Sequence, residues 1–349
     1  MPEARVIPLS PHPSGRGNRR SGTDVEATEP AVADDTPAPT SRTRKKVTDE
    51  QIVDALNEDV GGVPSEVLEV PGWERKVAGA LAFLRRRVTG DYEVDEFGFD
   101  PDLNDKVLMA AMRPLYERWF RVEVRGLENV PDTGGALVVA NHSGTVPIDS
   151  MMTGIALLDH HPAHRHLRML AADLAFTMPI IAPMARKAGH TLACNADAER
   201  LLSNGELVGV WPEGFKGVGK PFSERYKLQR FGRGGFVSAA LRCEVPIIPC
   251  AIIGAEEIYP IIGNLPTVAR LLGVPYLPIT PFFPALGPLG LIPLPSKWLI
   301  EFGEPIETNS VGAAGADDPM LVFNITDQVR ETIQQTIYKL LMQRRSVFF

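Results

Sequence analysis

A histidine and an aspartate lie seven positions apart in the stretch VVANHSGTVPIDS, residues 138–150. In an unbroken helix, His142 and Asp149 would be about 10.5 Å apart along the axis, too far for a hydrogen bond. Gly144 permits a sharp turn, and Pro147 is favoured at the first position of a helix, which places Asp149 in the first helical turn. The loop can then bring the carboxylate back to the imidazole.

Such a pair supports general-base chemistry, because the carboxylate fixes the tautomer of the imidazole and stabilises its protonated form. The other ring nitrogen of His142 then takes a proton from an attacking hydroxyl. The alternative is structural: His142 is a loop histidine with local hydrogen bonds, and Asp149 is an acid that interacts favourably with the helix dipole. The two residues by themselves leave both interpretations open.

A second polar turn follows an apolar run in VGVWPEGFKGVGK, residues 208–220. Its glycines expose backbone N–H groups and its lysines add positive charge, a combination suited to a phosphate or a developing oxyanion. Glu213, between Pro212 and Gly214, is placed to position an acceptor hydroxyl. The stretch is not a Walker loop, because the GxxxxGK[ST] pattern is absent, and a plain polar turn remains the structural alternative.

Short apolar runs rich in β-branched residues alternate with helical patterns from residue 121 onward. The strand-like runs are ALVVANH, HLRMLAA, GHTLAC, LVGVWPEG, VPIIPCAIIGA and LIEFGEPIE. Helix-like stretches such as NADAERLLSNG and GRGGFVSAALRC lie between them. This alternation predicts a layered α/β domain with its chemistry in loops at strand ends. Spacings of three and four predict a closing amphipathic helix through Val322, Ile325, Val329, Ile333, Ile337 and Leu340.

The N-terminal part of the chain has a different composition. Residues 1–47 contain few large apolar groups, so we expect a disordered tail. Residues 48–120 are expected to be an N-terminal helical region, in which residues 74–89 form a basic amphipathic helix. That helix either lies on a membrane surface or packs on the domain with its arginines in water. Residues 121–349 form the main domain, including the closing helix.

The overall composition excludes some classes of protein. The 349 residues are 44% hydrophobic and carry a formal net charge of −7. We expect no nucleic-acid partner, because phosphate-backbone binding needs a basic face. Three cysteines without metal-ligand spacing fit a reducing compartment, and we expect neither a secretory signal nor a membrane-spanning helix. These features predict a cytoplasmic location.

Histidines cluster in DHHPAHRH, residues 159–166, and imidazole is a good ligand for zinc or nickel. No cysteine or second cluster completes a site, and a turn around Pro162 explains the polarity. We therefore expect no metal.

Together, the motifs resemble the lysophospholipid acyltransferase superfamily, whose members include glycerol-phosphate and monoacylglycerol-type acyltransferases. The Asn-His block with a following acid matches Asn141, His142 and Asp149. The Phe-Pro-Glu-Gly block matches WPEG at residues 211–214. The Pro-Ile-x-Pro strand matches VPIIPCAIIG, and the block between them matches AGHTLACNADAERLL. All of these blocks occur in the family order.

The chain departs from the family pattern in two places. Six residues separate His142 from Asp149, a longer spacer than in most members, which looks like the monoacylglycerol-acyltransferase-like branch. Lys216 stands where the family has an arginine. Lysine lacks the bidentate geometry for phosphate, so this change favours a neutral acceptor over a phosphorylated one.

The resemblance implies an O-acyltransferase that moves a fatty acyl group from acyl-CoA or acyl carrier protein to a glycerolipid hydroxyl. His142 would be the general base and Asp149 would orient it. The residues expected to bind substrate are Asn141, Pro212, Glu213, Gly214 and Lys216. No metal or other cofactor is implied. The expected fold is an α/β acyltransferase domain with a mixed, mostly parallel sheet flanked by helices, preceded by helices and a disordered tail.

A lipid acceptor implies contact with a membrane surface. We expect peripheral attachment to the inner face of a membrane, through the basic helix 74–89 and the proline-rich apolar segment 271–296. That segment is expected to cap an acyl pocket, to lie in the bilayer interface, or to pack over the core as a loop. The alternative function is a non-catalytic lipid-binding protein on the same fold. A serine hydrolase is not supported, because no GxSxG elbow occurs.

Overall fold

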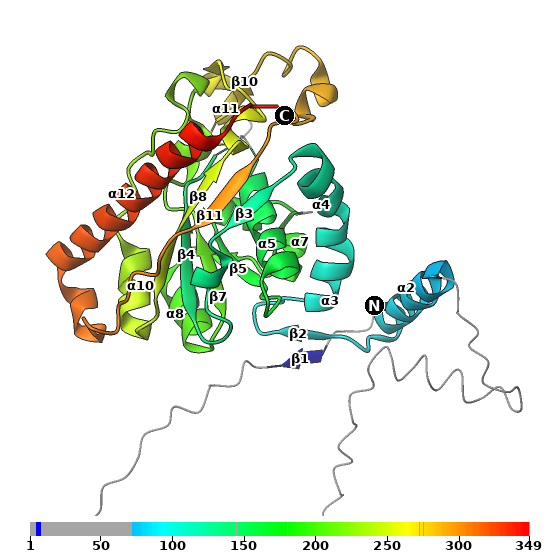
Figure 1. Ribbon diagram of the computed structural model, residues 1–349. Coiled ribbons are helices and arrows are strands. Elements are labelled where there is room, and N and C mark those ends of the chain that lie inside the picture. Colours follow the sequence, from blue (N-terminus) through cyan, green and yellow to red (C-terminus); the bar gives the residue numbers. More distant parts are fainter. Residues whose placement is uncertain are drawn as a thin grey trace, which may run out of the picture. The chain divides into compact units, whose positions relative to one another are not determined.

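The structure is a computed structural model that describes residues 5–7, 72–143, 146–179, 181–271, 273–274 and 276–348. The chain divides into two compact units, one comprising residues 1–5 and 13–92, the other residues 6–12 and 93–349. In the first unit, the main described element is α2 (Gly72–Thr89), which confirms the helix expected over residues 74–89 (Figure 1).

The N-terminal expectations fall largely outside the described residues. The tail expected over residues 1–47 lies outside them, apart from the short strand β1 (Arg5–Ile7), and so does the helical stretch expected between residues 48 and 71. The domain boundaries proposed from the sequence stay predictions.

The second unit is built on a seven-stranded sheet with the order β3-β11-β8-β4-β7-β5-β6. Every neighbouring pair is parallel except β11 and β8, which confirms the predicted mixed, mostly parallel sheet. The strands are β3 (Glu123–Arg125), β4 (Ala136–Ala140), β5 (Leu167–Ala171), β6 (Thr191–Leu192), β7 (Leu207–Val210), β8 (Ile247–Ile253) and β11 (Leu299–Phe302).

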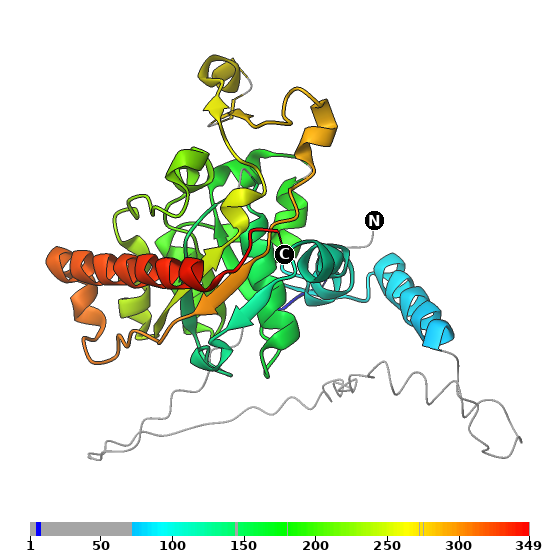
Figure 2. The same ribbon diagram turned by 45° about the horizontal axis from the view of Figure 1, so that its top comes forward.

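Helices cover both faces of this sheet (Figure 1, Figure 2). One face packs against α5 (Ile148–His160) and a continuous helical segment, residues 101–119. In that segment α3 (Pro101–Leu103) and α4 (Ala110–Pro114) alternate with the π-helical turns Asn104–Met109 and Leu115–Trp119. The other face packs against α8 (Asn195–Ser203), α10 (Gly235–Cys243) and α12 (Pro319–Gln343).

The central strand β4 contributes to both cores. Val138 packs with α5, whereas Leu137 and Val139 pack with the helices on the opposite face. A strand buried on both faces reads as a continuous apolar run, which is why ALVVA shows no polar alternation. The first polar residues, Asn141 and His142, therefore appear where β4 leaves the core at its carboxyl end.

Helix α12 confirms the predicted closing helix. Asp318 caps its N-terminus by accepting hydrogen bonds from the backbone of Met320 and Leu321, and Pro319 occupies the first turn. All six apolar residues predicted for its inner face are buried in the core.

The remaining elements are short. They are β2 (Glu93–Asp95), α6 (Asp173–Thr177), α7 (Ile181–Lys187), α9 (Phe215–Val218), α11 (Pro266–Leu271), and the antiparallel strands β9 (Gly263–Asn264) and β10 (Pro278–Ile279). In the described parts of segment 271–296, β10 is followed by a 3₁₀ turn, Gly287–Leu291. Across the ranges that the structure describes, no helix combines the length and apolarity needed to cross a bilayer.

Candidate active site

The predicted His-Asp contact is present at the carboxyl end of β4. The His142 Nδ1 atom lies 2.8 Å from Asp149 Oδ2. Pro147 directly precedes α5, so Asp149 occupies the first turn of that helix, as the sequence predicts. Gly144, to which the sequence assigns the turn, lies outside the described residues. The longer spacer therefore does not prevent the two side chains from meeting.

The Asp149 carboxylate is fully buried and oriented by several donors. Besides the imidazole, Oδ2 accepts a hydrogen bond from the Ser143 backbone N–H at 2.9 Å, and Oδ1 accepts one from the Ser150 N–H at 2.9 Å. Buried carboxylates need such partners, because an unsatisfied acceptor is costly. The contacts leave the carboxylate one orientation, with an oxygen directed at the ring of His142.

The second motif, residues 208–220, binds the backbone of His142 through Glu213. The His142 N–H donates to Glu213 Oε1 at 2.9 Å, and the Gln229 N–H donates to Oε2 at 2.6 Å. The Glu213 side chain has no exposed surface. In this structure both carboxylate oxygens therefore bind backbone groups, and the acceptor-binding role expected for Glu213 stays a prediction. What the contacts do show is that Glu213 holds the loop of His142 against residues 213–229.

Asn141 joins β4 to β8. Its Nδ2 donates to the Ile252 carbonyl at 2.9 Å, and its Oδ1 accepts from the Ile252 N–H at 2.7 Å. The side-chain amide thus takes the place of a backbone partner where the strand ends. Asn141 is completely buried, so a substrate-binding role is not visible in its contacts and remains a prediction.

The other predicted substrate-binding residues lie on the turn that follows β7. Pro212 is half-buried, and Gly214 and Lys216 are exposed. Gly214 has φ = 54° and ψ = −142°, a conformation open essentially only to glycine. The backbone reverses there and starts α9, which carries Lys216.

Helix α9 approaches the loop of His142 very closely. A Cβ atom on Gly217 would lie 2.7 Å from the His142 carbonyl oxygen and 2.8 Å from the Glu213 Cβ. The indole of Trp211 also lies near this loop, with its ring centroid 6.1 Å from that of His142. Only a glycine at position 217 lets the two motifs pack this tightly.

Lys220 belongs to a buried charge cluster rather than to an exposed basic turn. Its Nζ lies 3.0 Å from Glu256 Oε1 and 3.9 Å from Glu213 Oε2. Burial raises the pKa of Glu256 to about 7, against the opposing charge of Lys220. Burial also raises the pKa of Glu213, again opposed by Lys220. Sequence reasoning missed Glu256, although an acid so soon after a fully buried strand is a signal for a buried partner.

Two side chains of the histidine-rich stretch 159–166 contact backbone carbonyl oxygens. His161 Nε2 lies 2.9 Å from the Val130 carbonyl oxygen, and His164 Nδ1 lies 2.8 Å from the Leu158 carbonyl oxygen. Within the described residues, no three His, Cys, Asp or Glu side chains are grouped as metal ligands.

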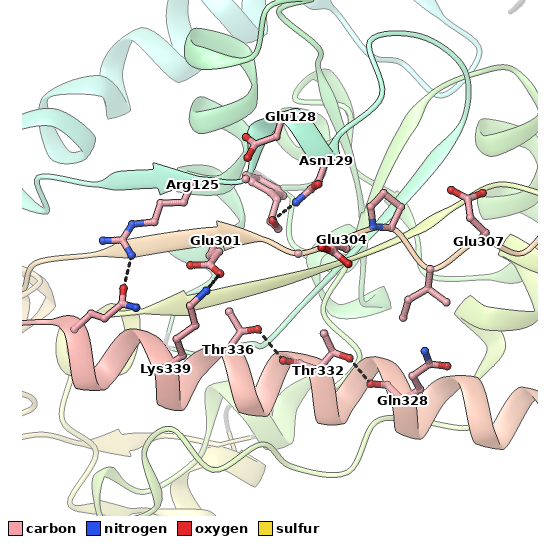
Figure 3. A pocket seen from close by; sticks show the side chains of 16 residues that line it. Arg125, Glu128, Asn129, Glu301, Glu304, Glu307, Gln328, Thr332, Thr336 and Lys339 are labelled. Atoms are coloured by element: carbon pink, nitrogen blue, oxygen red, sulfur yellow. Dashed lines mark hydrogen bonds and ion pairs between the residues drawn. The ribbon is translucent and has the colours of Figure 1, made fainter.

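A polar groove of about 860 Å³ lies between β11 and α12, away from these motifs (Figure 3). Its lining includes Glu128, Glu304 and Glu307, and the ion pair between Lys339 and Glu301. No residue of the His-Asp pair or of the second motif lines it.

Comparison with known proteins defines the class to which this fold and site belong. Residues 121–253 match the family model described as Acyltransferase. The match contains the His-Asp pair, the turn with Glu213, and β8. The chain belongs to the glycerolipid acyltransferase superfamily.

Individual relatives extend over different shares of the chain. An uncharacterised protein of Mycobacterium tuberculosis is 52% identical over 99% of this chain and 97% of its own length. The human DGAT1/2-independent enzyme synthesizing storage lipids is 28% identical over 38% of this chain and 39% of its own length. The crystal structure of the 1-acyl-sn-glycerophosphate acyltransferase PlsC from Thermotoga maritima has 17% sequence identity and a TM-score of 0.43, covering 76% of this chain and 89% of that one.

Proposed function

We propose that this acyltransferase moves a fatty acyl group from acyl-CoA or acyl carrier protein to the hydroxyl of a glycerolipid. The observation that carries the proposal is the 2.8 Å contact between His142 Nδ1 and the buried Asp149 carboxylate. With Nδ1 directed at Asp149, Nε2 is the nitrogen left to accept a proton. The His142 side chain keeps 14% of its surface exposed, so the imidazole is not sealed from solvent.

The chemistry follows from this geometry. As the acceptor oxygen attacks the thioester carbonyl, its proton passes to Nε2 of His142. Asp149 stabilises the resulting imidazolium. When the tetrahedral intermediate collapses, the carbon–sulfur bond breaks, an ester remains, and the proton leaves with the thiol. Direct attack on the thioester requires neither a metal nor a covalent enzyme intermediate.

For the acceptor, we propose a neutral glycerolipid. The buried cation of the second motif, Lys220, is already paired with Glu256 and oriented by the Lys227 carbonyl. A phosphorylated acceptor would compete with that pairing, while Lys216, the other lysine of the turn, is exposed and lacks the geometry for bidentate binding. The storage-lipid name of the human relative agrees with a neutral acceptor.

For the location, we propose peripheral attachment to the inner face of a membrane, with the enzyme otherwise in the cytoplasm. Segment 271–296 exposes several large apolar side chains, among them Leu286 at 53%, Leu289 at 66% and Ile292 at 55%. Helix α2 separately exposes a stripe formed by Val77, Leu81, Leu84 and Val88. Apolar surface of this kind is typical of an interfacial contact.

Vesicle flotation tests the membrane contact. We expect the double variant Leu286→Ser/Leu289→Ser to float less with anionic vesicles than the wild type. The matched control is Met320→Ser/Met342→Ser, which removes two exposed apolar side chains from α12. At about 1 M salt, where the screening length is roughly 3 Å, binding should weaken without vanishing, because only its electrostatic part is screened. Equal flotation of the two double variants would show that Leu286 and Leu289 of segment 271–296 do not contribute to membrane binding.

The acyl transfer itself is tested with a donor and acceptor panel. Purified protein is incubated with labelled acyl-CoA or acyl carrier protein and with monoacylglycerol, diacylglycerol or lysophospholipids. We expect a labelled ester with a neutral acceptor. The rival function, a non-catalytic lipid-binding protein, predicts saturable binding of the lipids without any labelled product.

A further inference from the structure

Three charged side chains, Lys220, Glu213 and Glu256, form a buried cluster that contacts the backbone of His142 through Glu213. The Lys220 and Glu213 side chains are 2% and 0% exposed, and that of Glu256 is 7% exposed. Lys220 donates to Glu256 Oε1 at 3.0 Å and to the Lys227 carbonyl at 3.0 Å. Two carboxylates therefore share one cation in a region from which water is largely excluded.

The cluster connects the site to the end of β8. Glu213 receives the backbone N–H groups of His142 and Gln229. Glu256 follows β8 and receives the Tyr226 N–H at 3.0 Å on Oε2. The loop 220–229 is thus held at one end by Glu213 and in the middle by Glu256, with Lys220 between the two acids.

We propose that Lys220 and Glu256 are positioning residues of the active site, which act through Glu213 on the backbone of His142. The inference rests on the proposed function, since it assigns these residues to the reaction of His142. Neither residue is expected to touch substrate, because both side chains are buried and directed at protein groups.

The physical reason is charge balance in a low dielectric. With Lys220 present, the three side chains carry a net charge of about −1 when ionised. Without it, two buried carboxylates would face each other uncompensated, and the pKa of each would rise. A protonated Glu213 is a weaker acceptor for the His142 N–H, because charge-assisted hydrogen bonds are the stronger ones.

The charge balance predicts the direction in which the pKa of Glu213 shifts in each variant. Burial already raises the pKa of Glu213, while Lys220, the backbone donors of Gln229 and His142, and the charge on His142 lower it. Glu256 faces Lys220, the Tyr226 N–H and Glu213. Removing Lys220 should raise the pKa of Glu213 further. Removing Glu256 should leave Lys220 to Glu213 alone and lower that pKa.

The test compares Lys220→Met, Glu256→Gln and the double variant with a matched control. The control is Lys339→Met, which breaks a Lys–Glu pair of similar length, 2.9 Å, on the exposed wall of the groove (Figure 3). For each protein, kcat and KM are measured against pH, and hydrogen–deuterium exchange is followed in peptides that contain the amides of His142 and Gln229.

For Lys220→Met we expect kcat to fall by about 10- to 100-fold, by analogy with the loss of a hydrogen-bond partner that orients a metal-ligating side chain. KM should stay within about twofold, since no substrate contact is lost. The acid limb of the kcat profile should move to higher pH, and to lower pH in Glu256→Gln. Exchange at the two amides should rise by about tenfold as their shared acceptor weakens. The double variant, which restores the net charge, should recover most of kcat and of the protection.

Three results would overturn the proposal. One is a Lys220→Met enzyme with the kcat and the amide exchange of the wild type. Another is a double variant whose kcat and amide protection do not exceed those of Lys220→Met. A third is a fall in kcat and a rise in exchange in Lys339→Met as large as those in Lys220→Met. If Lys220→Met does not fold, Glu256→Gln and the double variant still decide. If the wild type transfers no acyl group, the proposed function fails, and the exchange data still test the positioning of His142.

Discussion

Asp149→Asn is a nearly isosteric change that tests the orientation of His142. One carboxylate oxygen accepts from both His142 and the Ser143 N–H, and the other accepts from the Ser150 N–H. An asparagine has only one acceptor oxygen. If that oxygen keeps the first two bonds, the amide NH₂ faces the Ser150 N–H, and if it flips, the NH₂ faces the imidazole.

Either arrangement has a calculable consequence. At least one buried N–H loses its acceptor, which costs about 1–3 kcal/mol in the free energy of unfolding. In both arrangements the imidazolium loses its compensating charge, so kcat should fall by about 10²- to 10⁴-fold, the general-base contribution. KM for the acceptor should change little, because Asp149 is buried and does not reach the substrate.

The assay is steady-state acyl transfer, with circular dichroism and urea unfolding as the check of the fold. A folded Asp149→Asn protein with kcat within about threefold of wild type, against the expected general-base contribution, would refute the reasoning that Asp149 orients and stabilises the base.

Three further substitutions probe neighbouring contacts. The pKa of Glu256 is raised to about 7. Protonation of this group therefore favours the folded state at low pH, and that contribution to the free energy of unfolding is lost as the pH rises from 4.5 to 7. In Glu256→Gln, the free energy of unfolding should depend less on pH in this range, by about 3 kcal/mol at most. Asn141→Ala leaves a backbone N–H and carbonyl of β8 unpaired and should lower the free energy of unfolding by about 2–5 kcal/mol, measured by denaturant titration; a loss below 1 kcal/mol, against that estimate, would show that water replaces the amide. Gly217→Ala inserts a Cβ 2.7 Å from the His142 carbonyl oxygen and 2.8 Å from the Glu213 Cβ. The backbone at position 217 and the loop of His142 must then move apart, and since a 1 Å misplacement can cost about 10²-fold in rate, kcat should fall more than about tenfold. Unchanged kcat would mean that the close packing of the two motifs is not needed.

The sheet and its closing helix were predictable because their patterns are local. The apolar run of β4 and the three-and-four spacing in α12 both report burial directly. Strand β3, with the sequence Glu-Val-Arg, was not recognised, because a three-residue strand with two polar residues has no period to detect. Its position follows from parallel pairing with β11, about 175 residues later in the chain, and long-range pairing of this kind leaves no local signal.

The His-Asp contact was predictable because the end of the apolar strand and the helix start after Pro147 are encoded within a few residues. The directions in which the side chains of Asn141 and Glu213 point were not predictable. Both are polar residues at strand ends, where substrate contacts are common, yet both bind backbone groups of distant segments. The pair of Lys220 with Glu256 spans 36 positions, so the sequence shows a basic turn and a separate acid, and only the fold reveals that each compensates the other.

The most direct test of the central claim is the rate of acyl transfer by His142→Ala relative to wild type, with the exposed His160→Ala as a control histidine. His142→Ala should retain the fold and lose transfer by at least about 10²-fold, whereas His160→Ala should keep its rate. A folded His142→Ala enzyme that still transfers acyl groups within about threefold of wild type, far inside the range expected for loss of a general base, would contradict the assignment of His142 as the base.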